Sequence, residues 1–266
     1  LACDANEFTP DSIDEVLKSV KVPVFGGVFP KIIHEGRCYE KGSLAVSLPG
    51  VLKTLYIPEL SNSEIDYEAI LDAALPEIDT ARTLVVFPDG FSKRIGAFIE
   101  SLFNIFGLEI NYIGGGAGSL SMRQKPCLLT DDGMKSDGAI LAFLEMESGV
   151  GVSHGWELLK GPFRVTESDR NTIKTLDWRP AFDVYREVVE SHAEKTFETD
   201  DFFDISKAYP FGITRMGTEQ IVRDPVQVNK DRSLVCVGEV PEGSFVSILQ
   251  GSPRSLIRAA RRASTL

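Results

Sequence analysis

The sequence has few of the residues that cross-link small proteins or ligate metals. Its 266 residues include four cysteines (Cys3, Cys38, Cys127 and Cys236) with no C-x-x-C pair, and three scattered histidines. This spacing predicts neither a disulfide framework nor a zinc site. No apolar run approaches the ~18 residues of a membrane-spanning helix. We therefore expect a soluble protein with no bound metal, located in the reduced cytoplasm, with an acidic periplasmic domain as the alternative.

Basic residues are also scarce relative to acidic ones. Lys and Arg total 28 against 39 Asp and Glu, which gives a net charge of −11. A balance this acidic argues against nucleic acid or an anionic membrane as the main partner. With 43% apolar and 25% charged residues, the chain has a globular composition, and its length suggests about two domains.

An internal repeat organises the first half of the chain. Residues 1–48 and 84–145 share one plan: strand, amphipathic helix, strand ending in paired glycines, turn-rich interval with a hairpin, glycine-led strand. The first copy places its strands and helix at 1–4, 10–20, 22–27 and 42–48, and the second at 84–89, 95–106, 110–116 and 138–144. A further helix is expected at 66–78, between the copies.

The plan changes beyond residue 155. Strands are expected at 163–166, 171–177, 220–228, 234–240 and 245–249, with helices from Pro180 and Ser255. The predicted fold class is α/β: a duplicated unit forms layered sheets with helices outside, and a smaller mixed α/β domain follows. We place the two domains at 1–152 and 153–266.

Motifs spread over the whole chain resemble the FIST family. The resemblance to its N-terminal half is carried by Gly26-Gly27, Gly114-Gly115-Gly116-Ala117-Gly118, Gly155-Trp156, Val165-Thr166 and Trp178-Arg179-Pro180-Ala181 through Tyr185. The resemblance to its C-terminal half is carried by Arg223-Asp224-Pro225 through Ser233-Leu234 and by Val240-Pro241-Glu242-Gly243-Ser244. Against the family pattern the opening strand is short and the closing segment is missing, so we expect a trimmed domain.

The resemblance implies an intracellular sensory domain for small ligands. Such domains stand alone or are attached to signalling outputs in bacteria and archaea, and in eukaryotes they accompany an F-box in ubiquitin ligases. A subset binds haem and responds to nitric oxide. No F-box or output domain lies within these residues, so what the sensor would report to stays open, with a signalling protein or domain outside them as one possibility.

The paired glycines and two aspartates are the first candidates for a ligand site. Gly26, Gly27, Gly114, Gly115 and Gly116 follow predicted strands, where backbone N–H groups can face a ligand's carboxylate or phosphate. Their alternative role is close packing between the repeats. Asp4 and Asp89 end equivalent strands and could bind a ligand's amino group. Their alternative role is to form turns through side-chain hydrogen bonds to the backbone.

Further candidates lie in the second half. His154 could ligate haem iron, or it is a hydrogen-bonded structural residue. Trp156, with Trp178 and Tyr185, could form an aromatic wall or belong to the core. Arg215 and Arg223 could pair with a ligand carboxylate or form structural ion pairs. Four arginines (Arg254, Arg258, Arg261 and Arg262) give the last predicted helix a basic face, most simply solvated or paired with the acidic remainder.

Gly151-Val152-Ser153-His154-Gly155 matches the G-x-S-x-G string of a hydrolase nucleophile elbow. That elbow requires a strand–turn–helix context, which the flanking residues do not predict. No other nucleophile–base set emerges, so we expect a non-catalytic domain that senses a small amino-acid-like metabolite without a cofactor. The ligand is expected where the duplicated unit meets the second domain. The alternatives are a haem sensor of nitric oxide through His154, a substrate-recruiting module of an F-box ubiquitin ligase, and an esterase through Ser153.

Overall fold

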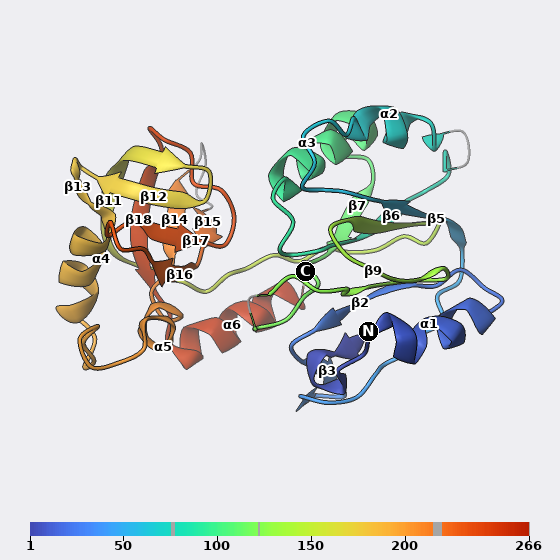
Figure 1. Ribbon diagram of the computed structural model, residues 1–266, viewed down its shortest axis with the longest axis horizontal. Helices are drawn as coiled ribbons and strands as arrows, with labels where there is room; N and C mark the ends of the chain where they lie inside the picture. Colours follow the sequence, from blue (N-terminus) through green and yellow to red (C-terminus); the bar gives the residue numbers. More distant parts are fainter. Residues whose placement is uncertain (76–77, 122, 215–219, 266) are drawn as a thin grey trace. The chain divides into compact units, whose positions relative to one another are not determined.

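The computed structural model describes residues 1–75, 78–121, 123–214 and 220–265. These residues form two compact units, Leu1–Val150 and Gly151–Leu266 (Figure 1). Both units combine helices and sheets, which confirms the predicted α/β class. Among the described residues, no helix has the length and apolar character needed to cross a membrane.

The first unit is a four-layer sandwich. One sheet has the strand order β1-β2-β8-β9 and the other has the order β5-β10-β6-β7. Its elements are β1 (Ala2–Cys3), the 3-10 turn η1 (Asp4–Asn6), α1 (Pro10–Ser19), β2 (Phe25–Phe29), β3 (Ile32–His34), β4 (Arg37–Tyr39), β5 (Val51–Ile57), α2 (Tyr67–Asp72), β6 (Thr83–Pro88), α3 (Ile95–Phe106), β7 (Asn111–Gly114), β8 (Leu128–Thr130), β9 (Gly133–Lys135) and β10 (Ala139–Leu144).

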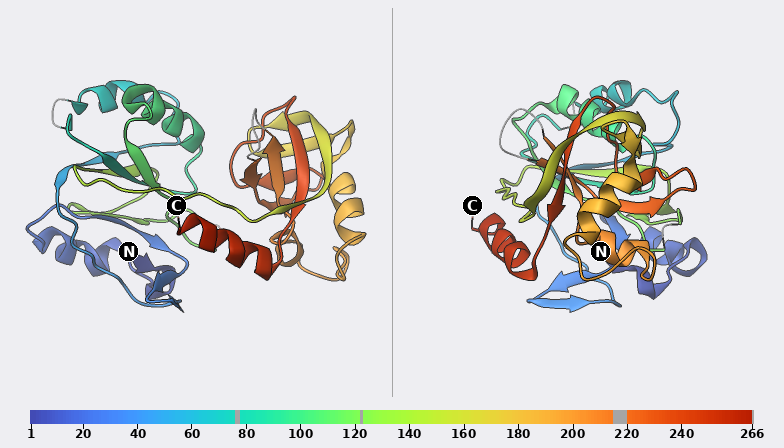
Figure 2. Two further views of the ribbon diagram at one scale, coloured as in Figure 1. Left: turned by 180° about the vertical axis from the view of Figure 1, so that it is seen from behind. Right: turned by 90° about the vertical axis from the view of Figure 1, so that its left-hand side faces the viewer.

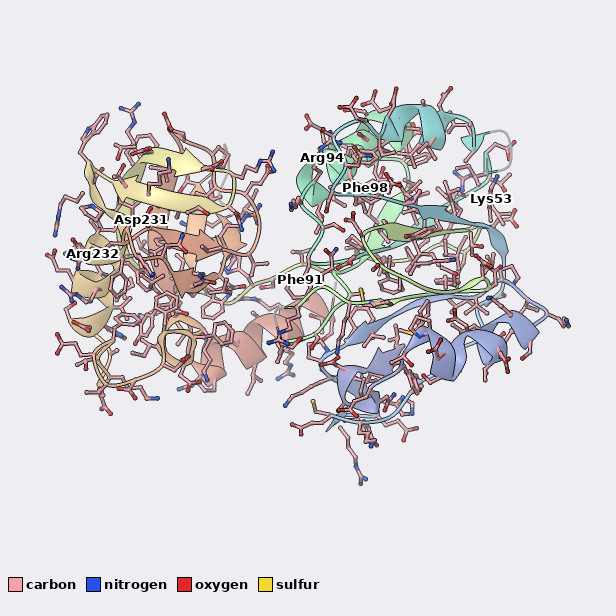
Figure 3. All side chains as sticks on the ribbon, viewed as in Figure 1. Lys53, Phe91, Arg94, Phe98, Asp231 and Arg232 are labelled. Atoms are coloured by element: carbon pink, nitrogen blue, oxygen red, sulfur yellow. The ribbon has the colours of Figure 1, made fainter. Side chains whose placement is uncertain are left out.

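Helices cover the outer faces of both sheets, as predicted. α2 and α3 lie on the β5-β10-β6-β7 sheet, and α1 lies on the β1-β2-β8-β9 sheet (Figures 1 and 2). Phe98 on the inner face of α3 is fully buried, and its ring meets Tyr67 of α2 edge-on, with the centroids 5.7 Å apart (Figure 3). The buried Leu17 of α1 shares a second core with Ile140 from the opposite sheet. Burial of these apolar side chains holds the layers together.

The two halves of this unit each contain a parallel strand–helix–strand motif, and they exchange their later strands. β1 and β2 pair in parallel and are connected by α1, and β6 and β7 pair in parallel and are connected by α3. The β8–β9 hairpin of the second half then pairs with β2, while β5 of the first half pairs with β10. Each sheet therefore contains strands from both halves, so neither half has a complete sheet of its own.

The strand predicted at 42–48 is wrong. The strand of the first half that joins the main sheet is β5, seven residues long at Val51–Ile57. Residues 42–44 instead form backbone hydrogen bonds with residues 1–3, from the Cys3 amide to the Gly42 carbonyl at 2.9 Å and between Leu44 and Leu1. Pro49 follows, and because proline lacks an amide donor it cannot continue a ladder. The apolar run at 42–48 is therefore not a sheet strand, and its first residues are bonded to the start of the chain.

The helix starts follow local capping chemistry. Thr9 and Ser12 form a capping box at α1, with Pro10 at its first position. Asp66 caps α2 by accepting a hydrogen bond from the Ala69 amide. α2 ends at Asp72, so the helix predicted at 66–78 is shorter than expected.

The second unit is a curled sheet with helices at its margins (Figure 2). Its strand order is β15-β14-β18-β11-β12-β17-β16, with β13 paired to β12. The elements are β11 (Glu157–Asp169), β12 (Thr172–Leu176), β13 (Arg179–Pro180), α4 (Ala181–Glu190), α5 (Phe202–Ser206), β14 (Phe211–Thr214), β15 (Gln220–Arg223), β16 (Pro225–Val228), β17 (Leu234–Cys236), β18 (Phe245–Gln250) and α6 (Pro253–Ala263). The 13-residue β11 pairs first with β18 and then with β12, so its bend joins the two parts of the sheet.

Candidate functional site

A bridging loop, described at residues 114–121 and 123–126, joins the two halves of the first unit. The Gly115 amide donates to the Val86 carbonyl at 3.1 Å and the Ala117 amide to the Pro88 carbonyl at 2.8 Å, which fixes the loop to β6. The Gly118 amide donates to the Val28 carbonyl of β2 at 2.8 Å. The bridging loop therefore crosses the ends of strands from both halves, where α/β folds commonly bind ligands.

The candidate glycines lie in this region and are largely used for close packing. A Cβ at Gly27 would lie 2.9 Å from the Ala117 Cβ, and a Cβ at Gly114 would overlap the Val86 carbonyl oxygen. Gly116 lies against the Cα of Gly90, whereas Gly115 and Gly26 have open space or ordinary contacts. Since the Gly115 and Gly118 amides bind protein carbonyls, this loop does not present a row of free donors to an anion.

Asp89 is a buried structural acceptor. Its carboxylate is fully buried and accepts hydrogen bonds from the Phe91 amide at 3.0 Å, the Asp137 amide at 2.8 Å and Gln124 Nε2 at 3.0 Å. The Cys127 thiol also donates to it, and burial together with the Asp89 charge raises the pKa of that thiol. Phe91 marks this end of β6 (Figure 3). The turn-forming interpretation thus accounts for Asp89.

Asp4, at the equivalent strand end, is partly exposed and ion-paired. Lys125 Nζ lies 2.6 Å from its Oδ1, and the Ser119 hydroxyl donates to its Oδ2. Partial burial opposes the charged form, but the hydrogen bonds from Lys125 and Ser119 and the lysine charge outweigh it, so the pKa of Asp4 lies below its usual value. Both aspartates are therefore tied to the bridging loop, Asp4 through Ser119 and Lys125 and Asp89 through Gln124.

A small hollow of about 260 Å³ lies beside η1. It is lined by Ile32, His34, Tyr39, Lys41, Gly42, Ser43 and Leu44. Hydrogen bonds attach its wall to the start of the chain: Asn6 Nδ2 donates to the Gly42 carbonyl at 2.8 Å, and the Gly42 amide donates to Asn6 Oδ1 at 2.8 Å. Asn6 Nδ2 also reaches the Ser43 hydroxyl at 3.1 Å. The wall of the hollow is thus bonded to the same turn that carries Asp4.

No residue of this hollow was selected from the sequence as a site residue. The available signal was the concentration of His34, Tyr39 and Lys41 in a turn-rich interval, where a positive charge, an imidazole and an aromatic ring lie within eight residues. Ser119, Gln124 and Lys125 were also missed, because nothing local connects them with aspartates more than thirty residues away.

The candidates of the second unit are not gathered into one site. His154 is exposed, and its Nδ1 accepts the Trp156 amide at 3.0 Å. The Trp156 ring lies against Gly251, where a Cβ would collide with it. Arg223 Nε donates to the Glu239 carbonyl at 2.9 Å, and its Nη1 to the Val222 carbonyl at 3.0 Å. Arg215 lies outside the described residues.

The aromatic residues considered for a ligand wall lie in different environments. Tyr185 is fully buried and donates to the Tyr209 carbonyl at 2.7 Å, whereas Trp178 is 80% exposed in the turn between β12 and β13. Haem requires a large apolar pocket around its ligand, but the exposed His154 is flanked by Val152, itself 71% exposed. These residues do not fit a haem site. Among the described residues, no cluster of three or more His, Cys, Asp or Glu could hold a metal ion.

The G-x-S-x-G string packs against α6. A Cβ at Gly151 would overlap the Ala263 carbonyl, and one at Gly155, which has φ +71°, would lie 2.7 Å from the Ala259 Cβ. The Ser153 hydroxyl accepts from Arg262 Nη2 at 3.2 Å. The string lies in irregular backbone ahead of β11, so the strand–turn–helix context of a nucleophile elbow is absent there.

Two family models together match nearly the full length of the chain. The model of the FIST N domain matches residues 2–179, and that of the FIST C domain matches residues 181–266. The chain belongs to the FIST family. The resemblance seen in its motifs is confirmed, and FIST domains are sensory domains of signal transduction. No curated protein and no solved structure matches this FIST domain.

Proposed function

We propose that this FIST domain senses a small amino-acid-like metabolite bound in the hollow beside η1. The observation that carries the proposal is the combination of a 260 Å³ recess with cationic and apolar lining residues. Drug-sized ligands occupy about 300–1,000 Å³, so this recess suits a smaller molecule. The four free cysteines are compatible with a reduced cytoplasm, where we place the protein.

The lining provides complementary chemistry for such a ligand. In the proposed complex the Lys41 ammonium and the His34 imidazole hold the carboxylate, since both side chains can donate hydrogen bonds. Ile32 and Leu44 contact the apolar part, and Tyr39 adds an aromatic face. A second hollow of about 470 Å³ between α2 and β5 has only Lys53 among aliphatic and small side chains, which suits a carboxylate less well.

The hydrogen-bond network provides a route from the hollow to the bridging loop. Ligand contact with residues 42–44 acts on Asn6 and on residues 1–3, because these segments are hydrogen-bonded to each other. Asp4 lies within η1 and binds Ser119 and Lys125. In our proposal, occupancy of the hollow shifts the population of conformations of the bridging loop, which is how a binding domain without chemistry transmits a signal.

We propose binding without covalent chemistry. The Ser119 hydroxyl donates to Asp4, but the pKa of that carboxyl is lowered, which makes it a weak base. Among the described residues, the Ser153 hydroxyl makes no hydrogen bond to a base: it accepts from Arg262, and His154 Nδ1 accepts the Trp156 amide. Neither serine therefore has the base that an activated nucleophile requires.

A thermal-shift panel of the twenty common amino acids tests this function. An amino acid present at about 100 times its dissociation constant should stabilise the protein by about 2.7 kcal/mol. Lys41→Met should weaken the response at least tenfold, because it removes the positive charge that holds the carboxylate. Lys21→Met, on an exposed lysine away from the hollow, is the matched control and should respond like the original protein. A panel with no stabilising amino acid, or an unchanged response in Lys41→Met, would contradict the proposal.

A further inference from the structure

Helix α6 has two chemically distinct faces. Its inner face carries Leu256, Ala259 and Ala263 and packs against residues 151–155 through the two glycines of the G-x-S-x-G string. Its outer face carries Arg254, Ile257, Arg258 and Arg261, at positions i, i+3, i+4 and i+7, which we call the arginine face. All four side chains are exposed, and Ile257 is 70% exposed.

The arginine face is a local excess of positive charge in an acidic chain. Residues 243–266 contain four arginines and no acidic residue, so the rest of the chain carries −11 − 4 = −15. Within the described ranges, the guanidinium groups of Arg254, Arg258 and Arg261 have no ion-pair or hydrogen-bond partner, while that of Arg262 donates to Ser153. The positive charges of the arginine face are therefore available to bind an anionic group of another molecule.

Helix stability does not explain these arginines. Arg254 lies in the first turn, where the helix dipole disfavours a positive charge, although Arg261 in the last turn is favourably placed. Arg254 and Arg258 are a like-charge pair at i, i+4, which destabilises a helix slightly. Exposed Ile257 among them likewise adds nothing to the core.

We propose that the arginine face is a docking surface for an acidic amphipathic segment of a partner protein. The 11 residues of α6 span about 16 Å, the length of about three turns of a partner helix. Carboxylates at matching i, i+4, i+7 spacing reach successive guanidinium groups, whose planar forks bind them bidentately. Ile257 provides the apolar anchor at the centre of the contact, and arginine is enriched at such interfaces.

Charge and size favour a short acidic segment over an extended polyanion. A nucleic acid or an anionic membrane extends beyond 16 Å and would meet a chain whose residues outside 243–266 carry a net charge of −15 (−11 − 4). Ile257 is the one large apolar side chain on this face, which is too little for insertion into lipid. A short acidic protein segment, in contrast, can bind along α6 without extending over the acidic remainder of the chain. This interface lies in the second unit and is independent of ligand binding in the hollow.

A synthetic helical peptide with Glu at i, i+4 and i+7 around a Leu is the probe. Its binding is measured by fluorescence anisotropy at low salt. A peptide with Gln in place of each Glu is measured under the same conditions as the uncharged control. Arg258→Glu/Arg261→Glu should weaken binding at least tenfold, and Arg258→Lys/Arg261→Lys should weaken it less, because the charge remains but the fork is lost. The matched control is Lys21→Glu/Lys230→Glu, which changes net charge equally at exposed sites elsewhere and should bind normally.

Circular dichroism and the melting temperature verify that each variant is folded. Absence of binding to the Glu peptide, equal binding of the Gln peptide, or equal losses in the test and control variants would overturn the proposal. Tighter binding to a short single-stranded RNA or to phosphatidylserine vesicles than to the Glu peptide would also overturn it.

Discussion

Replacing Asp89 by alanine should lower the free energy of unfolding by about 3–5 kcal/mol, among the largest single-residue effects in the first unit. The substitution leaves the Phe91 and Asp137 amides without the fully buried carboxylate that accepts from them, whereas the exposed Gln124 side chain can turn to water. Unsatisfied buried donors cost about 1–3 kcal/mol each, with partial relaxation. Urea unfolding followed by circular dichroism measures the change.

Asp4→Ala is the matched control, because Asp4 follows β1 as Asp89 follows β6. Its side chain is 25% exposed and its partner Lys125 is 44% exposed, so water can replace the lost contacts. We expect a cost of about 1 kcal/mol, as for other partly exposed ion pairs. Equal losses of stability in the two variants would refute the distinction between the fully buried Asp89 and the partly exposed Asp4.

Gly151→Ala should displace α6 and cost about 2 kcal/mol. The added Cβ would overlap the Ala263 carbonyl, and because that atom is backbone, the helix must shift as a whole. Limited proteolysis should cut within residues 251–266 faster than in the original protein, and urea unfolding gives the stability change.

Ser153→Ala, two residues along the same segment, tests the specificity of this effect. It removes one exposed hydrogen bond from Arg262 and should cost less than about 1 kcal/mol. If Gly151→Ala left the proteolysis rate unchanged while Ser153→Ala raised it, the packing role assigned to the two glycines would be wrong.

Local sequence patterns predicted α1, α3, α4, α6 and the general layer arrangement, but they made α2 too long and missed α5. α1 and α3 follow apolar periodicity, and Thr9 and Pro10 mark the start of α1 through chemistry that is fully local. The exchange of strands between halves was not predictable, because the pairing of β5 with β10 joins residues more than eighty positions apart. The same limit explains the error at 42–48, where pairing with the chain start replaced the expected sheet partner.

Sequence identified the two aspartates as equivalent but could not assign their different environments. Asp89 is buried because Gln124, Cys127 and Asp137 converge on it from distant segments. Asp4 meets Ser119 and Lys125 at the edge of the same loop and stays partly exposed. The G-x-S-x-G string shows the opposite case, since a local motif suggested chemistry while its glycines serve contact with α6.

Hydrogen exchange in the presence of the most stabilising amino acid tests the central claim directly. The account predicts slower exchange in residues 39–44, which line the hollow, together with a change in the bridging loop at residues 114–121 and 123–126. In Asp4→Asn, which weakens the ion pair with Lys125, the hollow should still be protected while the response of the loop is reduced. Protection confined to other segments, or a loop response unchanged in Asp4→Asn, would contradict ligand binding in the hollow and its relay through Asp4.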